Sequence, residues 1–548
     1  MNQKRGRAAM EDKIPPFAHK MPVYAPNLYF EALDAEPKVF ERFSPGNILE
    51  DDVCILNQIH RVDFSKMEAI DGEVNNLWLF NLYYGEYLIY LVTRAKKEKR
   101  EDLILKSRDI FKALAESFDR PGIGRAPYVL SLQMVNLVIS WNIVDYMKSS
   151  MNGKAETWFY ADLYRKYKFL QSHTEKHLLA NHYFENIKTL LIFAMIFGEE
   201  EKVKEYKSLL EAELVEQILP DGMHYERSFM YHKIILEDLI RVYLASQTTP
   251  WEPEIKDLVF PYIRKMCIFS DRMESEFSRT PLFNDAGDNV AKPLKTLLKA
   301  ATLLGAIENS ELLANTGNES EGFAFPHAGY YKQNKGIYSM IVDAGPVGPS
   351  YNPGHHQNDC LSFEFFSKKR PVIVNSGCYS YFGNLRAYQR STAAHNTFMV
   401  DDTEQSQCWQ SHRVAKRMSD VGLTMEENGF VGHFTDYKGH NAKRTIEFTG
   451  TYFAFTDECT DEGTHKITSF LHFEPEIKLE KISDTEVLLI DKKREIPTLK
   501  LSVNAGSMEV FADSARHLYS PEFGIMKVAS AVEITGEKVK VTVEENHD

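Results

Sequence analysis

Two kinds of hydrophobic periodicity divide this chain of 548 residues, and the change between them constrains the fold most strongly. From about Leu79 to Leu304, apolar residues recur at helical spacing, in segments such as LWLFNLYYGEYLIYLVTRA and YHKIILEDLIRVYLA. After about Glu321 the pattern alternates, in runs such as GIYSMIVDAG and TIEFTGTYFAFTDE, which is typical of strands. A helical region followed by a strand-rich region predicts separate α and β layers, and not an alternating α/β fold.

The chain is longer than one hydrophobic core normally serves, so we expect two large domains in a multidomain α+β protein. Many helices joined by short loops favour an α/α toroid, an incomplete barrel, over a single four-helix bundle. Strand runs separated by turn residues favour an antiparallel β-sandwich. The expected boundaries are an N-terminal extension at 1–40, the toroid at 41–305, a polar linker at 306–322 and the sandwich at 323–548.

The formal net charge is −14, from 64 Lys and Arg against 78 Asp and Glu. A general nucleic-acid partner is therefore not expected, because phosphate binding needs a basic face. An acidic polysaccharide would be repelled at long range, so it would require a local basic groove. The oligomeric state is left open.

The six cysteines are widely spaced and form no Cys-x-x-Cys pair, which indicates free thiols in a reducing compartment. The basic N-terminal residues are not followed by an apolar segment, and no run of apolar residues is long enough to span a membrane. The expected location is cytoplasmic, or periplasmic if a leading segment has been removed.

Residues with catalytic side chains are concentrated where the strand-rich region begins, in GPSYNPGHHQNDCLSFEFF and VNSGCYSYFGNLRAYQRSTAAHNT. Gly354 and Pro353 place His355 on a turn that enters a strand, and catalytic groups often lie on such loops. The same segments contain His356, Asp359, Tyr379, Tyr381, Arg386, Tyr388, Arg390 and His395.

Two helical segments add further candidates. ANHYFEN places His182 and Glu185 three residues apart on one helix face, directly after Asn181. ERSFMYHKIILEDL places Tyr231 at the start of an amphipathic helix, after Arg227. Taken singly, such residues are more often structural than catalytic.

Taken together and in this order, these segments resemble the heparinase II/III-like polysaccharide lyases over about residues 75–412. The resemblance rests on the Asn-His pair, the later Ser-x-x-Tyr-His, the loop that begins with Gly-His, and the strand Arg-Ser-Thr-x-Ala-His-Asn-Thr. It implies β-elimination at a uronic acid within a polysaccharide, with the active site between the two domains.

The chemistry of this reaction explains the residue types. The C5 proton leaves only when the neighbouring carboxylate is neutralised, and an acid must then protonate the departing C4 oxygen. The resemblance implies that Asn181 holds the carboxylate, assisted by His182 or Glu185. Tyr231 would be base, acid or both, and His355 the other proton-transfer group. The predicted substrate-binding residues are Glu185, Arg227, Tyr128, Arg386 and Arg390.

The chain departs from the family pattern at the zinc position. Gln357 stands where the second histidine of the loop is usual, and Asn375 where an aspartate is usual, so that only His395 is kept. Neutral amides are poor zinc ligands. We therefore expect no cofactor and substoichiometric zinc, with the three side chains hydrogen-bonded to one another in place of the metal.

Two other functions stay open at this point. A glycoside hydrolase on the same scaffold would need a carboxylate pair, for which Asp285, Asp288 and Glu226 are candidates. A non-catalytic glycan-binding protein would keep the groove and lose turnover. An unsaturated product would distinguish a lyase from both. The polymer, and endo or exo action on it, are not predicted.

Overall fold

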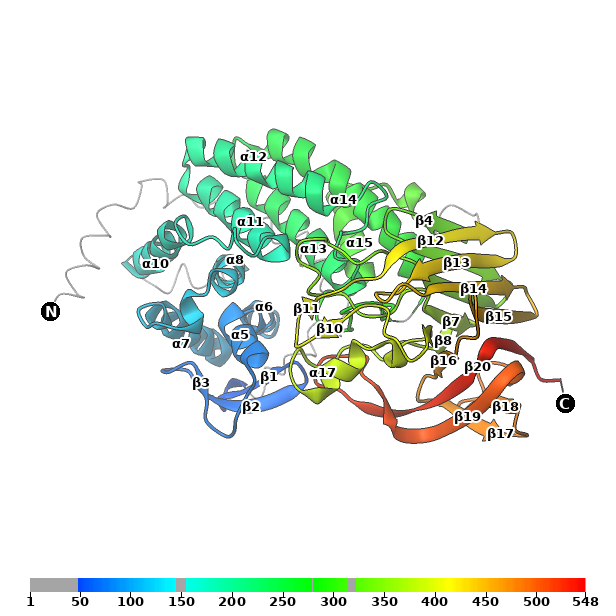
Figure 1. Cartoon of the computed structure of the whole chain (residues 1–548). Helices are drawn as coiled ribbons and strands as arrows, with labels where there is room; N and C mark the ends of the chain where they lie inside the picture. The colour runs from blue at the N-terminus through cyan, green and yellow to red at the C-terminus, as the bar shows by residue number, and fades with distance from the viewer. Residues whose placement is uncertain (1–47, 144–153, 278, 314–321, 548) are drawn as a thin grey trace. The chain divides into compact units, whose positions relative to one another are not determined.

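The computed structural model describes residues 48–143, 154–277, 279–313 and 322–547 (Figure 1). The expected N-terminal extension at 1–40 and residues 314–321 of the expected linker lie outside the described residues.

The chain divides into two compact units. The first contains the residues up to Gln217, together with Ile235–Arg264 and Thr296–Ile307. The second contains Ile218–Ile234, Lys265–Lys295 and the residues from Glu308 onward, so it includes helical segments as well as strands. The domain boundaries expected from the sequence stay predictions.

Helices make up most of the first unit, after a small antiparallel sheet of β1 (Asp52–Ile55), β2 (Gln58–Asp63) and β3 (Glu68–Ala69). The helices are α5 (Asn76–Tyr84), α6 (Tyr87–Glu98), α7 (Glu101–Ser117), α8 (Pro127–Ile143), α10 (Lys154–Leu170), α11 (Ala180–Phe197) and α12 (Glu200–Gln217). Three further helices, α13 (Phe229–Ser246), α14 (Glu252–Glu274) and α15 (Leu294–Leu303), have residues in both units.

Local sequence signals set the helix ends. The Asn75 side chain accepts a hydrogen bond from the Trp78 backbone at 2.9 Å and caps α5, which ends at Gly85 in the left-handed conformation. Gly198 ends α11 in the same way. Every residue of α11 except His182 is buried, and α11 lies beside α12 in Figure 1.

Two antiparallel sheets form most of the second unit. The five-stranded sheet runs in chain order through β4 (Gly322–Phe325), β5 (Tyr330–Lys335), β6 (Tyr338–Asp343), β7 (Phe363–Ser367) and β8 (Arg370–Ile373). The larger sheet has the order β12 (Ser419–Glu426), β13 (Gly429–Thr435), β14 (Asn441–Phe448), β15 (Tyr452–Cys459), β20 (Lys527–Glu545), β19 (Leu499–Tyr519), β18 (Glu486–Asp491) and β17 (Ile477–Lys481).

Two smaller pairings complete this unit. Strand β16 (Ile467–His472) pairs with β20 and with β9 (Phe398–Val400). Strands β10 (Cys408–Trp409) and β11 (Arg413–Val414) form a separate hairpin, and the short helix α17 spans Asn384–Gln389.

The two large sheets share one apolar core. Phe365 of β7 lies 4.7 Å from Phe453 of β15 between ring centroids, and Phe363 lies 5.8 Å from the same ring. Alternating apolar residues on β14 and β15 supply part of this face, as the period of a half-buried strand requires. The predicted order, a helical region followed by antiparallel sheets, is confirmed.

A buried ion pair ties the core to two loops. Arg444 of β14 and Asp457 of β15 are register partners, and the guanidinium donates to both carboxylate oxygens at 2.6 and 2.7 Å. Arg444 Nη1 donates to the carbonyls of Leu361 and Asn396, and these bonds hold the two loops in place. Among the described helices, none is both long and apolar enough to span a bilayer.

Candidate active site

The candidate site in the second unit is built around His355, on the loop between β6 and β7. Its Nδ1 lies 3.0 Å from Asp285 Oδ2, and its Nε2 lies 3.7 Å from Glu226 Oε2. An ionised carboxylate accepts only, so Nδ1 carries the proton and donates it to Asp285. This tautomer leaves the Nε2 lone pair available for proton transfer. The side chain keeps 14% of its surface exposed, so a substrate atom can reach it.

Asp285 is held in place by several hydrogen bonds and orients His355. It is fully buried and accepts hydrogen bonds from Gln357 Nε2 at 2.7 Å and from both terminal nitrogens of Arg386. Burial alone would raise the pKa of Asp285, but the Arg386 guanidinium and the hydrogen bond from His355 outweigh it and lower the pKa. Asp285 therefore stays ionised and orients the imidazole.

Backbone hydrogen bonds hold these two segments together. The Asp285 N–H donates to the His355 carbonyl at 3.1 Å, and the Gln357 N–H donates to Asn284 Oδ1 at 3.1 Å. Asn284 itself has a φ of 53°, a left-handed conformation that asparagine tolerates better than most residues. The geometry between Asp285 and His355 is thus set by the backbone as well as by the side chains.

Tyr231 lies in the first turn of α13, with its ring 4.0 Å from the His355 ring between centroids. Its hydroxyl is 2.7 Å from the hydroxyl of Tyr381, and both rings are buried. The Arg386 guanidinium lies 5.1 Å from the Tyr381 ring centroid, so the cation that neutralises Asp285 also supports this tyrosine. Tyr231 and His355, predicted to act together, are therefore adjacent.

The three predicted substrate-binding arginines all contact protein groups. Arg386 pairs with Asp285, and Arg390 donates to the carbonyls of His356, Gln410 and Arg413. Arg227 donates to the carbonyls of Ala328, Tyr225 and His327. These contacts show that the arginines hold loops in place, and the predicted direct contact with substrate stays a prediction.

The remaining predicted residues lie in the first unit. The His182 ring packs against Tyr128 at 4.4 Å between centroids, and its Nδ1 lies 3.4 Å from Glu175 Oε2. Its side chain is 39% exposed, whereas the preceding residue, Asn181, is buried. The convergence of Asn181 with Tyr231 and His355 stays a prediction, because Asn181 belongs to the other unit.

Glu185 lies inside the first unit, not on its surface. It is fully buried beside Lys188, whose ammonium also donates to Asp238 at 2.6 Å. Burial, with the charge of Asp238, raises the pKa of Glu185 well above its usual range. This environment disfavours the predicted direct contact between Glu185 and substrate, which stays untested.

The position at which the family pattern places zinc holds Gln357, Asn375 and His395 in this chain. His395 Nε2 lies 3.0 Å from the Gln389 carbonyl and its Nδ1 lies 3.1 Å from Asn375 Oδ1, and a neutral imidazole donates to only one of these two oxygens. Asn375 Oδ1 also accepts from Ser362 at 2.7 Å. The expected contact between His395 and Asn375 is therefore present. The Gln357 side chain donates instead to Asp285.

Substituting His395 by Asn is expected to leave the zinc content of the full, untagged chain unchanged, because no strong ligand set surrounds this residue. Elemental analysis of the variant and the unmodified chain tests this. A loss of zinc that follows the substitution would show that neighbouring groups rebuild a metal site there.

Asp285, His355 and His412 also offer ligand atoms within 4.8 Å of one another. Both Asp285 oxygens already accept hydrogen bonds from cationic or amide donors, so this carboxylate has little charge left for a metal. Burial, with the charge of His355, lowers the pKa of His412 to about 4, so His412 is neutral at physiological pH.

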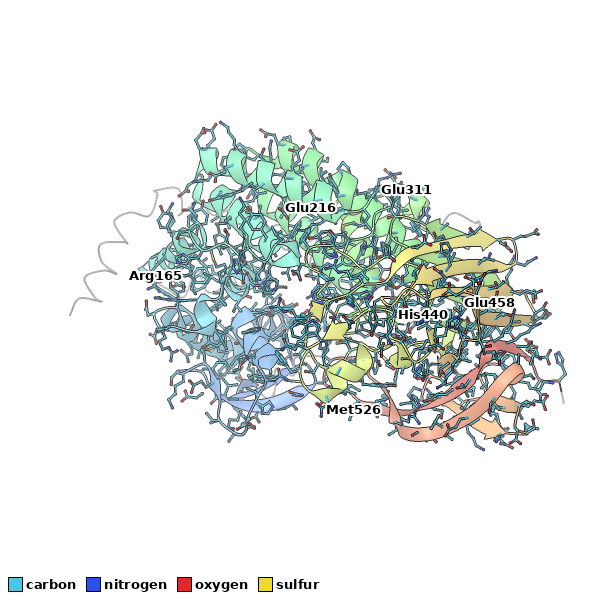
Figure 2. All side chains as sticks on the ribbon, in the orientation of Figure 1. Arg165, Glu216, Glu311, His440, Glu458 and Met526 are labelled. Carbon is cyan, nitrogen blue, oxygen red and sulfur yellow. The ribbon has the colours of Figure 1, made fainter. Side chains whose placement is uncertain are left out.

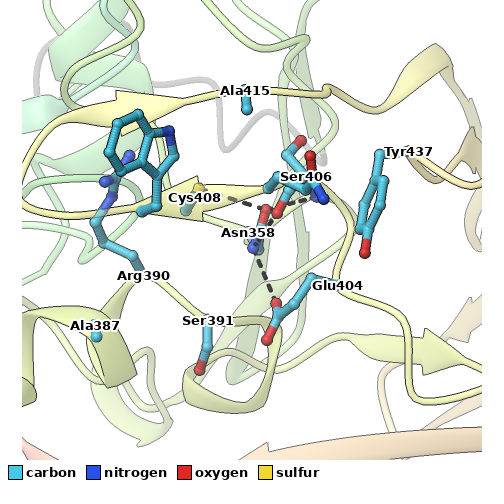
Figure 3. A pocket seen from close by; sticks show the side chains of 11 residues that line it. Asn358, Ala387, Arg390, Ser391, Glu404, Ser406, Cys408, Ala415 and Tyr437 are labelled. Carbon is cyan, nitrogen blue, oxygen red and sulfur yellow. Dashed lines mark hydrogen bonds between the residues drawn. The ribbon is translucent and has the colours of Figure 1, made fainter.

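A pocket of about 440 Å³ lies on the β10–β11 hairpin (Figure 3). Asn358, Glu404 and Arg390 line it together with Trp409 and Tyr437. Asn358 donates to Glu404 at 2.9 Å and accepts from the Ser406 backbone at 2.9 Å, which braces the floor of the pocket. The turn of the same hairpin carries His412, whose ring lies 5.9 Å from His355 between centroids.

A buried histidine, His232, predicts that the second unit loses stability as the pH falls. His232 Nε2 lies 3.2 Å from the Met266 carbonyl, and burial lowers the pKa of His232 to about 3. The ordinary value, in the unfolded chain, is about 6.5. Between these two values only the unfolded chain binds the proton. The free energy of unfolding therefore falls as the pH falls, by about 1.4 kcal/mol per pH unit for this group.

The variant His232→Gln is therefore expected to lose stability more slowly than the unmodified chain as the pH is lowered from about 6.5 towards 4. Urea unfolding at several pH values measures the two slopes. Equal slopes would mean that His232 is protonated in the folded chain or titrates normally there.

Comparison with known proteins identifies the family. The family model "Heparinase II/III N-terminus" matches residues 142–305, and "Heparinase II/III-like, C-terminal" matches residues 318–545. Together they cover well over half of the chain. The chain belongs to the heparinase II/III-like family.

A curated heparin-sulfate lyase of Pedobacter heparinus is 24% identical over 210 residues, which are 36% of this chain. The match spans 31% of that relative, about a third of its length. The crystal structure of a heparinase III is similar with a TM-score of 0.71 at 15% identity, over 90% of this chain and 80% of the other. The crystal structure of a mutant heparan sulfate lyase of Pedobacter heparinus is similar with a TM-score of 0.61 at 16% identity, over 92% of this chain and 83% of the other. At these identities the heparinase-like structures show the shared fold alone.

Proposed function

We propose that this member of the heparinase II/III-like family is a polysaccharide lyase that cleaves a uronic-acid-containing polysaccharide by β-elimination. The observation that carries the proposal is the contact between Tyr231 and His355, with the imidazole held in one tautomer by Asp285. Two proton-transfer groups, a phenol and an oriented imidazole, lie together as the elimination requires.

In the proposed reaction, the substrate carboxylate is first neutralised, a role we assign to Asn181 with His182. One group of the Tyr231–His355 pair then takes the C5 proton, and the other protonates the C4 oxygen as the C4–O bond breaks. A double bond forms between C4 and C5. Ionised Asp285 stabilises the imidazolium whenever His355 holds the extra proton.

Two of the three candidate carboxylates do not suit a hydrolase. A glycosidase needs one carboxylic acid that donates a proton and a second carboxylate that acts as base or nucleophile. Asp285 is bound to Arg386 and stays ionised, so it cannot be the acid. Asp288 accepts from the Thr280 backbone at 2.9 Å, a contact typical of a structural carboxylate. A non-catalytic glycan-binding protein has no need of the oriented His355 imidazole.

We propose an acidic polysaccharide of the glycosaminoglycan type as substrate. The matched relatives are described as heparin or heparan sulfate lyases, and a uronic acid is the unit on which β-elimination acts. We also propose that the helices form an incomplete α/α toroid and the two large sheets a β-sandwich, which the apolar core between the sheets supports.

The test is a panel of uronate polymers incubated with the purified chain. Ultraviolet absorbance reports unsaturated ends, and a reducing-sugar assay reports all new ends. Equal numbers of both ends support the lyase. Reducing ends without absorbance would indicate a hydrolase, and neither product from any polymer would favour a binding protein.

A further inference from the structure

Three strand ends of the second unit bring together a group of histidine and acidic side chains away from the candidate active site. Asp401 follows β9, His440 precedes β14, and His465 precedes β16. One ligand atom from each of the three lies within 4.8 Å of the others. His440 is labelled among the strands in Figure 2.

Strand pairing positions these residues. Val400 of β9 pairs with Ile467 of β16, and the Asp401 N–H donates to the Lys466 carbonyl at 2.8 Å. The Lys466 N–H donates to Asp401 Oδ1 at 2.8 Å, which leaves Oδ2 directed at the histidines. Asp401 Oδ2 lies 2.8 Å from His465 Nδ1 and 3.8 Å from His440 Nε2.

In each histidine, the ring nitrogen that is not directed at Asp401 lies close to another acceptor: Nδ1 in His440 and Nε2 in His465. Asp436, itself buried, accepts from His440 Nδ1 at 2.8 Å, while its other oxygen accepts three backbone N–H groups of the turn. His465 Nε2 lies 3.4 Å from the Glu462 carbonyl. Metal-bound histidines almost always donate their second N–H to a carboxylate or carbonyl in this way.

This pattern places two acceptors face to face. With its proton on Nδ1, neutral His440 presents the Nε2 lone pair to Asp401 Oδ2, which is also an acceptor. A cation between them, either a second proton or a metal ion, turns the contact into an attraction.

We propose that Asp401, His440 and His465 bind a zinc ion, which joins the end of β9, the β13–β14 turn and the β15–β16 loop. Two imidazoles and one carboxylate suit zinc, whereas calcium and magnesium prefer oxygen ligands alone. Tetrahedral zinc separates its nitrogen and oxygen ligands by about 3.3 Å. The distances from Asp401 Oδ2 to His465 Nδ1 and His440 Nε2, 2.8 and 3.8 Å, lie on either side of that value.

Cys459 is a candidate for a fourth ligand. Cys459, Asp461 and His465 also offer ligand atoms within 4.8 Å of one another, so the Cys459 thiol lies beside the same histidine. The three proposed ligands are partly exposed, at 39% for Asp401, 23% for His440 and 18% for His465, which leaves an entry path for the ion. The proposal departs from the sequence-based expectation of substoichiometric zinc in the whole chain, which rested on the residues at and near Gln357, Asn375 and His395.

The test uses the full, untagged chain stripped with a chelator and then titrated with zinc or calcium. We expect stoichiometric zinc binding that raises the melting temperature, and no comparable effect of calcium. His465→Asn and Asp401→Asn are expected to weaken zinc binding at least tenfold, and Asp436→Asn by about 10–100-fold because it orients His440. His433→Asn, which replaces an exposed histidine of β13 in the same sheet, is the matched control and should bind zinc as before.

A second measurement needs no variant. Cobalt(II) bound to the unmodified chain is expected to give the intense visible spectrum of a four-coordinate site, with a sulfur-to-metal band if Cys459 is a ligand. The proposal is overturned if zinc does not bind saturably, if cobalt shows only the weak six-coordinate spectrum, or if bound zinc survives His465→Asn and is lost in His355→Asn.

Discussion

Tyr231→Phe is expected to reduce polymer cleavage by about 10²–10⁴-fold while leaving the fold intact. The substitution removes one hydroxyl and keeps the ring that packs on His355 at 4.0 Å. Deleting a proton-transfer group lowers the rate of the chemical step, whereas the packing of the first turn of α13 is preserved. The measurement compares kcat, KM and the melting temperature of the variant with those of the unmodified chain.

Tyr225→Phe is the matched control for this prediction. Tyr225 also shares a hydroxyl–hydroxyl contact with another tyrosine, 2.8 Å from Tyr351, in the same unit. The control loses the same kind of contact but no group that packs on His355, so it should keep most of the activity. An active Tyr231→Phe chain, or equal losses in both variants, would refute the role given to Tyr231.

Asp285→Asn is expected to have the second large effect, on activity and stability together. An amide donates where the carboxylate accepted, so His355 Nδ1 would lose its proton and Nε2 would carry it instead. This wrong tautomer should lower the cleavage rate on the order of 10²-fold or more. The variant also leaves Arg386 buried without its counter-charge, which costs about 3–5 kcal/mol in the free energy of unfolding.

The variant Asp457→Asn distinguishes the effect on activity from the effect on stability. Asp457 forms the other buried carboxylate–arginine pair described above, with Arg444, inside the sheet core. This control should lose a comparable free energy of unfolding in urea denaturation while the folded fraction keeps its cleavage rate. If Asp285→Asn is destabilised but fully active when folded, Asp285 holds the fold and does not orient His355.

The sequence was sufficient to predict the order of the two regions and the contact between Tyr231 and His355. The first rests on a local signal, the change of hydrophobic period. The second is implied by the family resemblance and not by a local signal. The family resemblance joined two motifs that lie far apart in the chain, and their rings are in contact in the structure.

Residues whose roles depend on tertiary contacts could not be predicted. Asp285 lies in a loop after α14 with no motif around it, and it appeared only as a carboxylate for a rival mechanism. Arg386 and Arg390 look like substrate-binding groups in the sequence, yet in the structure they bind a carboxylate and loop carbonyls. The Asp401–His440–His465 cluster depends on strand register, which the sequence pattern does not specify between distant strands.

The central claim is that Tyr231 and His355 remove a proton from carbon 5 of a uronic acid. The most direct measurement uses an oligosaccharide with deuterium at that carbon and follows its cleavage by NMR. The account predicts slower cleavage than with the protonated oligosaccharide, and one deuterium released to solvent for each bond broken. Products that retain the deuterium and form at an unchanged rate would contradict it.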